Sequence, residues 1–333
     1  MSTILITGAT SFLGYHVAKK LNQSGIRPRV LERPGSKFDV LDGLDVERCP
    51  GDLDDAAALR AACRGVDTLL HLAFKVSVGG GAAALEEMQR VNVEGTRSLL
   101  RAAAASGVRR AVVTGSALAI GVNRQPTPLD ESANWSQHGL DLPYANLRRQ
   151  VELDALAQAT PQFAVMTVCP SLTFGPEDPS GAPANKLLQA IVAGKVPAKV
   201  TIGFGALDVR DFAQGMILAG DRGRSGQRYL LSGENITAQQ LLEQVAAITG
   251  VRPPRFTAPI ALLRVLVGAV ELLSRIRRTP PPITGDVLQI FGRYAWYNTA
   301  KSRDELGWMP RPLKETLTDT IQWLRAQPPV AKI

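Results

Sequence analysis

Residues 4–14 read ILITGATSFLG, and this stretch decides the fold. Its first four residues are typical of a short buried strand, and the small residues that follow are typical of a tight turn opening a helix. The first amides of such a helix have no partner inside it and can hold a pyrophosphate. The stretch therefore predicts a dinucleotide-binding turn, in which the cofactor lies against Thr7, Gly8, Thr10, Ser11, Phe12, Leu13 and Gly14.

Short β-branched runs alternate with Ala- and Leu-rich stretches through the first half of the chain. This alternation is typical of βαβ units and a doubly wound parallel sheet. We expect an α/β fold with a Rossmann domain over residues 1–168, to which a segment of about 206–232 returns, and a smaller mixed substrate lobe over 169–333. The expected strands are 3–7, 29–31, 68–72, 111–114, 164–168, a strand near 200–202 and 228–231, and the expected helices are 13–24, 54–63, 83–106 and 144–159.

The composition is that of an ordinary globular protein of 333 residues, with 45% hydrophobic and 20% charged residues. A net charge of +8 raises the question of a nucleic-acid partner. The basic residues are scattered in ones and twos, as in Arg109-Arg110 and Arg148-Arg149, without a motif that reads DNA or RNA. We therefore expect no nucleic-acid partner, and a positive surface that attracts an anionic cofactor or substrate.

The three cysteines, Cys49, Cys63 and Cys169, show no CxxC spacing, and the chain has three histidines. This pattern favours neither a disulfide framework nor a zinc site. The first residues also lack the basic and apolar regions of a secretory signal. We therefore expect no metal site and a reduced, cytoplasmic location.

Residues 258–276 read APIALLRVLVGAVELLSRI, almost enough to span a bilayer. Arg264, Glu271 and Arg275 interrupt the apolar run, which favours an amphipathic helix with a buried face over a membrane span. Peripheral membrane contact through this helix is the less favoured alternative.

Glu32 and Arg33 follow the second expected strand, 24 residues after Gly8 in the case of Glu32. An acid there accepts hydrogen bonds from the ribose 2′-hydroxyl of NAD, whereas an arginine pairs with the 2′-phosphate of NADP. Both residue types are present, so both cofactors stay open, with NADP slightly favoured.

Five short segments match separate motifs that occur together in one protein family. They are TGATSFLG at 7–14, GDL at 51–53, HLA at 71–73, NVEGT at 92–96 and KSRDELGWMP at 301–310. Together they resemble the extended short-chain dehydrogenase/reductase family of the NAD-dependent epimerase/dehydratase type. Within it, the chain is similar to nucleoside-diphosphate-sugar epimerases and to dihydroflavonol-reductase-like proteins, including hopanoid-associated sugar epimerases. The resemblance implies that the cofactor also contacts Asp52, Leu53, Leu72, Ala73, Asn92, Tyr144, Arg148 and Pro170.

The resemblance further implies that Ser116 and Tyr144 are the catalytic hydroxyls. Hydride transfer at an alcohol or ketone needs a group that takes or gives the proton on oxygen, and an ionised tyrosine can do this. Arg148 follows Tyr144 by four residues, so a helix places both on one face. One positive charge at about 4 Å stabilises the ionised phenol by on the order of 4 kcal/mol. We expect Ser116, Tyr144 and Arg148 to form the catalytic site.

Three residues depart from the family pattern. Arg148 stands where the family has lysine, Ser11 where it has the middle glycine, and Cys169 where relatives usually carry arginine. Arginine keeps the charge, but its planar fork cannot reproduce lysine's compact contact with the nicotinamide ribose. A Cβ at position 11 costs clearance from the pyrophosphate, although the hydroxyl can offer a hydrogen bond.

Two classes of function follow. The first is an NAD(P)-dependent oxidoreductase or epimerase that moves a hydride at a hydroxyl or keto carbon of a nucleotide-sugar or a polycyclic hydroxyketone, with a dihydroflavonol-reductase-like ketone reductase as a variant. The second is a cofactor-binding regulator or scaffold with impaired catalysis, which the three departures motivate. The resemblance also implies a homodimer formed through the helices at 83–106 and 144–159.

Overall fold

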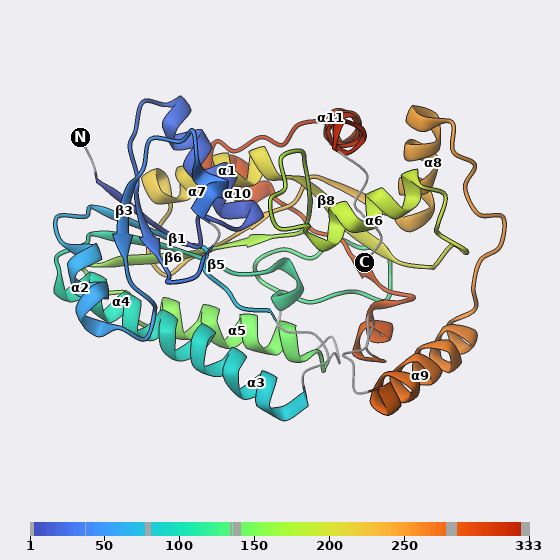
Figure 1. Cartoon of the computed structure of the whole chain (residues 1–333), viewed down its shortest axis with the longest axis horizontal. Helices are drawn as coiled ribbons and strands as arrows, with labels where there is room; N and C mark the ends of the chain where they lie inside the picture. Colours follow the sequence, from blue (N-terminus) through green and yellow to red (C-terminus); the bar gives the residue numbers. More distant parts are fainter. Residues whose placement is uncertain are drawn as a thin grey trace.

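The computed structural model describes residues 3–36, 38–76, 81–133, 135, 141–277 and 285–327. Within them, seven parallel strands form one sheet in the order β3-β2-β1-β4-β5-β6-β9 (Figure 1). This order confirms the doubly wound sheet predicted from the sequence. The strands are β1 (Ile4–Thr7), β2 (Arg29–Glu32), β3 (Glu47–Pro50), β4 (Thr68–His71), β5 (Arg110–Thr114), β6 (Ala164–Pro170) and β9 (Arg228–Leu231).

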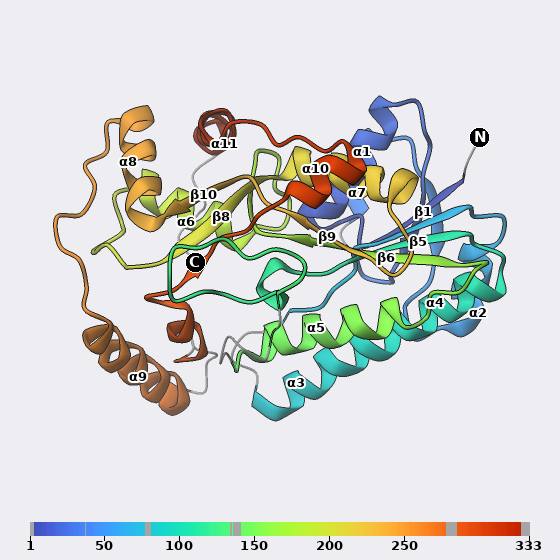
Figure 2. The ribbon, with the colours of Figure 1, turned by 180° about the vertical axis from the view of Figure 1, so that it is seen from behind.

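Helices cover both faces of this sheet, as Figures 1 and 2 show. Successive strand residues point to opposite faces, so Leu5 of β1 packs into one core while Ile4 and Ile6 pack into the other. The core around Leu5 includes side chains of α2 (Ala56–Cys63), α4 (Gly95–Ala105) and α5 (Pro143–Leu156). The core around Ile4 and Ile6 includes side chains of α1 (Phe12–Gln23), α7 (Val209–Arg222) and α10 (Ala300–Leu306).

A smaller sheet forms the second lobe, with β8 (Gly203–Asp208) at its centre. β10 (Glu234–Thr237) pairs with β8 antiparallel, whereas β7 (Leu172–Phe174) and β11 (Tyr294–Ala295) pair with it in parallel. Its core contains Phe174, Phe204 and side chains of three helices. The lobe's helices are α6 (Pro183–Val192), α8 (Ala238–Thr249), α9 (Ile260–Arg277) and α11 (Leu313–Ala326), with the 3₁₀ helix η5 (Gly285–Ile290) beside α9.

The chain passes back and forth between the two lobes. After β6 it builds β7, α6 and β8 of the second lobe, and then returns with α7 and β9 to the seven-stranded sheet. It next builds β10, α8, α9 and β11 before α10 returns to pack against α7 and β9. Each lobe is therefore assembled from separated stretches of sequence.

The expected helix at 83–106 is interrupted. The structure has α3 (Gly81–Gln89), a π-helical turn η2 (Arg90–Glu94) and then α4. Asn92, within the π turn, uses its side-chain amide to bind both the backbone N–H and the C=O of Lys75, at 2.7 and 2.8 Å. Periodicity alone does not predict such a turn, because it depends on a contact with a distant loop. The homodimer interface on these helices stays a prediction.

Five strands also differ from expectation, because β8 begins later than expected and β3, β7, β10 and β11 were not expected. The strand expected near 200–202 begins only at Gly203, where pairing with β10 and β11 starts. β3 was not expected, because its sequence ERCP has no β-branched residue and ends in proline. It forms an edge strand that pairs with β2 alone, and an edge position tolerates this composition.

Candidate active site

The turn after β1 is built on two glycines. Gly8 has a φ of 74°, and a Cβ on it would lie 2.5 Å from the backbone nitrogen of Ala73. A Cβ on Gly14 would lie 2.1 Å from the carbonyl oxygen of Gly8. No side chain fits at either position, so only glycine allows this close approach of α1, β1 and β4. The first amides of α1, from Phe12 and Leu13, have no acceptor within the helix and suit a phosphate oxygen.

Ser11, which replaces the middle glycine, caps α1. Its φ of −80° and ψ of 163° are extended values that any residue adopts, so its Cβ brings no backbone strain. Its hydroxyl accepts a hydrogen bond from the Gly14 N–H at 3.1 Å and donates one to the Gly8 carbonyl at 2.7 Å. The serine therefore holds the turn together and leaves the helix N-terminus intact.

A cavity of about 400 Å³ lies in front of this turn, at the carboxyl ends of β1, β2 and β4. Arg33 and Ser36, which follow β2, line it, whereas Glu32 is not one of its lining residues. The backbone of Glu32 joins β2 to the residue after β3, because its carbonyl accepts a hydrogen bond from the Gly51 N–H at 2.8 Å. The sequence-predicted residues that line this cavity are Thr7, Gly8, Thr10, Ser11, Arg33, Asp52, Leu53, Leu72 and Ala73.

A second cavity, of about 530 Å³, adjoins the first, since Ser11, Leu72, Phe74 and Val76 line both. Among its described lining residues, Arg148 is the one charged side chain. Its outer walls are mostly apolar and include Leu118, Val122, Leu172, Ile202, Phe204 and Ile290. The sequence-predicted residues that it brings together are Ser11, Phe12, Leu13, Leu72, Ser116, Tyr144, Arg148 and Pro170.

Tyr144 and Arg148 meet on one face of α5, as their spacing indicates. The Nε of Arg148 donates a hydrogen bond to the Tyr144 Oη at 3.1 Å, and its Nη1 donates one to the Thr114 carbonyl at 2.9 Å. Arg148 is buried, so little water weakens these bonds. Ser116 follows β5, is also buried, and accepts a hydrogen bond from the Leu118 N–H at 3.3 Å. The arrangement fixes a cation on the phenol oxygen, where negative charge develops when the proton leaves.

Phe74 is a part of the site that sequence reasoning missed. The guanidinium carbon of Arg148 lies 3.4 Å from the centre of the Phe74 ring, and the Phe74 and Tyr144 rings meet edge to face at 5.9 Å. Stacking on an aromatic face holds the planar guanidinium group in place. A lysine at this position has no planar group and would not need such a partner. The only sequence signal was that Phe74 directly follows the HLA segment.

His71 is a structural residue. Its ring nitrogens lie 2.6 Å from the Thr7 Oγ1 and 2.8 Å from the Thr96 Oγ1, so it joins β1 to α4. Burial, and secondly the charge of Arg148, lower the pKa of His71 to about 3. The ring is therefore neutral at neutral pH and adds no charge beside Arg148.

Three sequence-predicted cofactor contacts, Gly14, Glu32 and Asn92, line neither cavity. Gly14 is needed for the close packing of α1 described above. Asn92 affects the first cavity indirectly, because its side chain holds the backbone of Lys75, a residue that lines this cavity.

Cys169, the third departure from the family pattern, lies in β6, next to the cavity-lining residue Pro170. It is fully buried, and its thiol donates a hydrogen bond to the Glu152 Oε2 at 3.0 Å. Burial, and then the Glu152 charge, raise the pKa of the Cys169 thiol. The charge of the buried Glu152 is compensated by Arg228 of β9, whose Nη1 lies 3.0 Å from the Glu152 Oε1.

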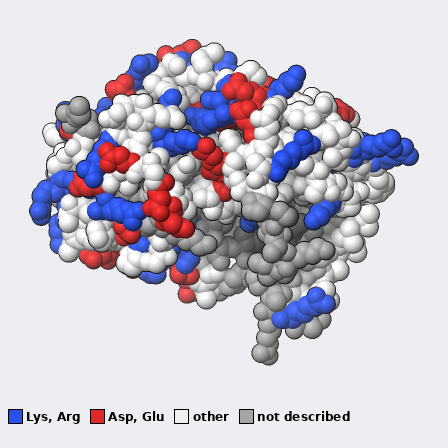
Figure 3. All heavy atoms as spheres, turned by 45° about the horizontal axis from the view of Figure 1, so that its top comes forward, with Lys and Arg blue, Asp and Glu red and all other residues white. Residues whose placement is uncertain are grey.

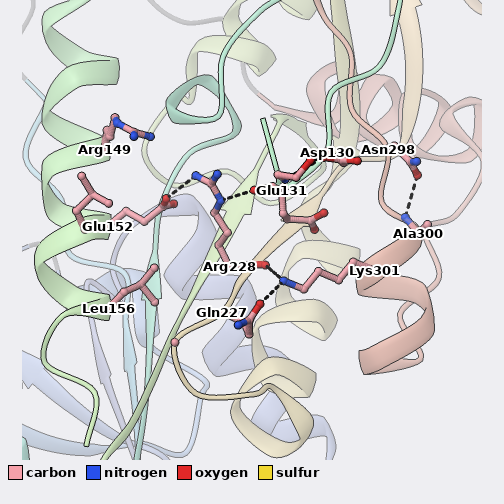
Figure 4. A pocket seen from close by; sticks show the side chains of 13 residues that line it. Asp130, Glu131, Arg149, Glu152, Leu156, Gln227, Arg228, Asn298, Ala300 and Lys301 are labelled. Atoms are coloured by element: carbon pink, nitrogen blue, oxygen red, sulfur yellow. Dashed lines mark hydrogen bonds and ion pairs between the residues drawn. The ribbon is translucent and has the colours of Figure 1, made fainter. Parts of the chain in front are cut away.

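A third cavity, of about 540 Å³, lies along the open edge of β9, and the ion pair between Arg228 and Glu152 lies in its wall (Figure 4). Arg228 also donates to the backbone carbonyl of Glu131 at 2.8 Å, and Lys301 donates to the Gln227 side chain at 2.8 Å. Because none of Ser116, Tyr144 and Arg148 lines this cavity, it is no candidate for the chemistry.

Charge is dispersed over the face drawn in Figure 3, where Lys and Arg side chains alternate with Asp and Glu in small groups. Among the described residues, no cluster of three or more His, Cys, Asp or Glu side chains is placed to hold a metal ion.

Comparisons with known proteins agree on one family. The profile of the NAD dependent epimerase/dehydratase family matches residues 4–232. Sterol demethylase protein B of Methylococcus capsulatus is 32% identical over 329 residues, which cover 97% of this chain and 98% of that protein.

Solved structures show the same fold. The crystal structure of gox2253 is 33% identical, covers 98% of both chains and superposes with a TM-score of 0.85. A nucleoside-diphosphate-sugar epimerase from Pseudomonas aeruginosa is 24% identical, covers 97% of both chains and has a TM-score of 0.78. This chain therefore belongs to the NAD-dependent epimerase/dehydratase family of extended short-chain dehydrogenases.

Proposed function

We propose that the protein is an NADP-dependent oxidoreductase that transfers a hydride at a hydroxyl or keto carbon of an apolar substrate, of the polycyclic hydroxyketone class. The observation that carries this proposal is the second cavity, where Ser116, Tyr144 and Arg148 lie at the end of an otherwise apolar chamber. The adjoining first cavity, with its glycine turn, fits a dinucleotide.

Tyr144, Arg148 and Ser116 each have a separate role in the proposed hydride transfer. A nicotinamide dinucleotide held by the glycine turn at the first cavity would supply or accept the hydride. For oxidation of an alcohol, the ionised Tyr144 takes the hydroxyl proton at its Oη while the carbinol C–H electrons leave as hydride, and for reduction both steps reverse. The Arg148 Nε–H, 3.1 Å from that oxygen, stabilises its negative charge. Ser116 holds the substrate oxygen by a hydrogen bond.

The substrate class follows from the charge of the cavity walls. A nucleoside-diphosphate sugar carries two negative charges and needs cations or free N–H groups around its pyrophosphate. Arg148, the one charged side chain among the described lining residues, is already bonded to Tyr144 and Thr114. An apolar polycyclic molecule instead gains free energy by burial against such walls. The relative from Methylococcus capsulatus is named for a sterol, which supports the same class.

The preference for NADP rests on Arg33, which lines the first cavity while Glu32 does not. We expect Arg33→Ala to weaken NADPH binding by about 10- to 150-fold, the loss of one charge-assisted hydrogen bond of roughly 1.5–3 kcal/mol. NADH binding should change little, because NADH has no 2′-phosphate. Calorimetric titration measures both. Arg27→Ala is the matched control, since Arg27 pairs with Asp45 on the surface, and equal losses for NADPH and NADH in Arg33→Ala would contradict the assignment.

Turnover with two substrate panels tests the function itself. Purified protein is incubated with NADP and polycyclic secondary alcohols, with NADPH and the matching ketones, and separately with nucleoside-diphosphate sugars. We expect a change in nicotinamide absorbance with the apolar panel only. Turnover of the sugar nucleotides alone would refute the substrate class, and tight cofactor binding without turnover of either panel would refute the enzyme.

A further inference from the structure

α9 carries an apolar face that points to solvent. Val265 is 70%, Leu272 60% and Leu266 52% exposed, and Leu262 and Leu273 are exposed as well. Single exposed apolar residues are common, but a contiguous group of this kind marks an interaction surface. Together with Val270, these side chains form what we call the α9 apolar face.

The spacing of the residues shows how the helix is oriented. At about 100° per residue, positions 262, 265, 266 and 273 fall on one side of α9. Val267 and Ser274 fall on another side and are buried against the body of the protein. Arg264 falls on a third side and is exposed. α9 is thus anchored along one side while its apolar face stays open over most of its length.

α9 is also in contact with segments that form the walls of the second cavity. It packs against η5, whose last residue, Ile290, lines that cavity. The segment before α9 is hydrogen-bonded to Lys199 through the carbonyl of Phe256 and the N–H of Ala258, close to the lining residue Ile202. Figures 1 and 2 both show α9 at the outer edge of the second lobe. The apolar face and the apolar cavity therefore lie in one part of the molecule.

The charged residues around α9 indicate what kind of partner its apolar face binds. Residues 252–277 contain five arginines and one glutamate. Arg252, Arg255, Arg264 and Arg277 are exposed. An apolar face beside exposed basic residues is typical of helices that lie flat on anionic bilayers. Of the helices in the described residues, none has the length and apolar character needed to cross a membrane.

We propose that α9 docks the protein on an anionic lipid bilayer, with its apolar face at the boundary between headgroups and acyl chains. Docking in this way holds the wall of the second cavity at the membrane, where an apolar substrate is dissolved. This last consequence rests on the proposed function, whereas the docking itself does not.

Vesicle co-sedimentation of the full-length protein tests the docking. The vesicles are phosphatidylcholine alone or phosphatidylcholine with phosphatidylglycerol, and neither cofactor nor substrate is present. We expect binding to the anionic vesicles, and partitioning about tenfold weaker or more for the double variant Val265→Gln, Leu272→Gln, because binding scales with buried apolar area. Glutamine forms helices well, so α9 is kept. The control is Leu187→Gln with Met309→Gln, two exposed apolar residues outside α9, which should bind like the native protein.

The outcomes separate the alternatives. Equal binding of the native protein and the α9 double variant, or binding by neither, overturns the proposal. If neither binds but sedimentation velocity shows a dimer that the double variant abolishes, the face is an interface between two copies and the lipid proposal is wrong. Vesicle binding by a protein that turns over no substrate supports the docking and refutes the proposed function alone.

Discussion

Tyr144→Phe is expected to lower turnover by about 10²–10⁴-fold, the usual contribution of a positioned acid or base. The variant removes only the Oη, which is the atom that meets the Arg148 Nε. The ring and its edge-to-face contact with Phe74 remain, so the cavity keeps its shape. Cofactor affinity should therefore stay close to that of the native protein. Steady-state turnover and calorimetric cofactor titration measure the two effects separately.

Tyr297→Phe is the matched control, because Tyr297 lines the same cavity and its hydroxyl donates to the Gly121 carbonyl at 3.1 Å. Its loss removes a structural hydrogen bond and should reduce turnover far less. If Tyr144→Phe lowers turnover only slightly, or if the two substitutions lower it equally, Tyr144 is not the acid or base of the reaction.

Arg148→Met is expected to reduce turnover by about a thousandfold. A single positive charge at about 4 Å contributes on the order of 4 kcal/mol to an ionised phenol at an effective dielectric near 20, which corresponds to that factor. Methionine can still pack against Phe74, so the loss should appear mainly in turnover. Steady-state turnover and calorimetric cofactor titration check whether the loss lies in turnover.

Arg148→Lys is the comparison for this effect, since it keeps the charge but loses the fork that reaches both the Tyr144 Oη and the Thr114 carbonyl. We expect a smaller loss than in Arg148→Met. Turnover that appears only with lysine at position 148, in a native chain that binds cofactor but converts nothing, would instead favour a cofactor-binding regulator. Thermal unfolding of both variants separates a folding defect from a catalytic one.

The turn and the Tyr144–Arg148 pair could be predicted because each depends on residues close in sequence. Gly14 is fixed by steric clearance from Gly8 within one turn, and residues four apart on a helix must share a face. The doubly wound, parallel class of the larger sheet followed from the alternation of strands and helices along the chain, whereas its strand order was not predicted.

Features that depend on distant segments could not be predicted. The stacking of Phe74 on Arg148 and the bonds that join Glu152 to Cys169 and Arg228 each connect elements far apart in the chain. The choice between Glu32 and Arg33 depends on which side chain the loop after β2 turns toward the cavity, and the residue types alone do not decide this.

The passage of the chain between the two lobes limits how such a protein can diversify. The lobe built on the seven-stranded sheet is completed by α7, β9 and α10, which alternate in sequence with segments of the second lobe. A single recombination event cannot exchange the second lobe as a module, because the exchange would also replace parts of the seven-stranded sheet. Point replacements in the walls of the second cavity, at positions such as Leu118, Val122 or Ile290, avoid this difficulty because none of these residues belongs to either sheet.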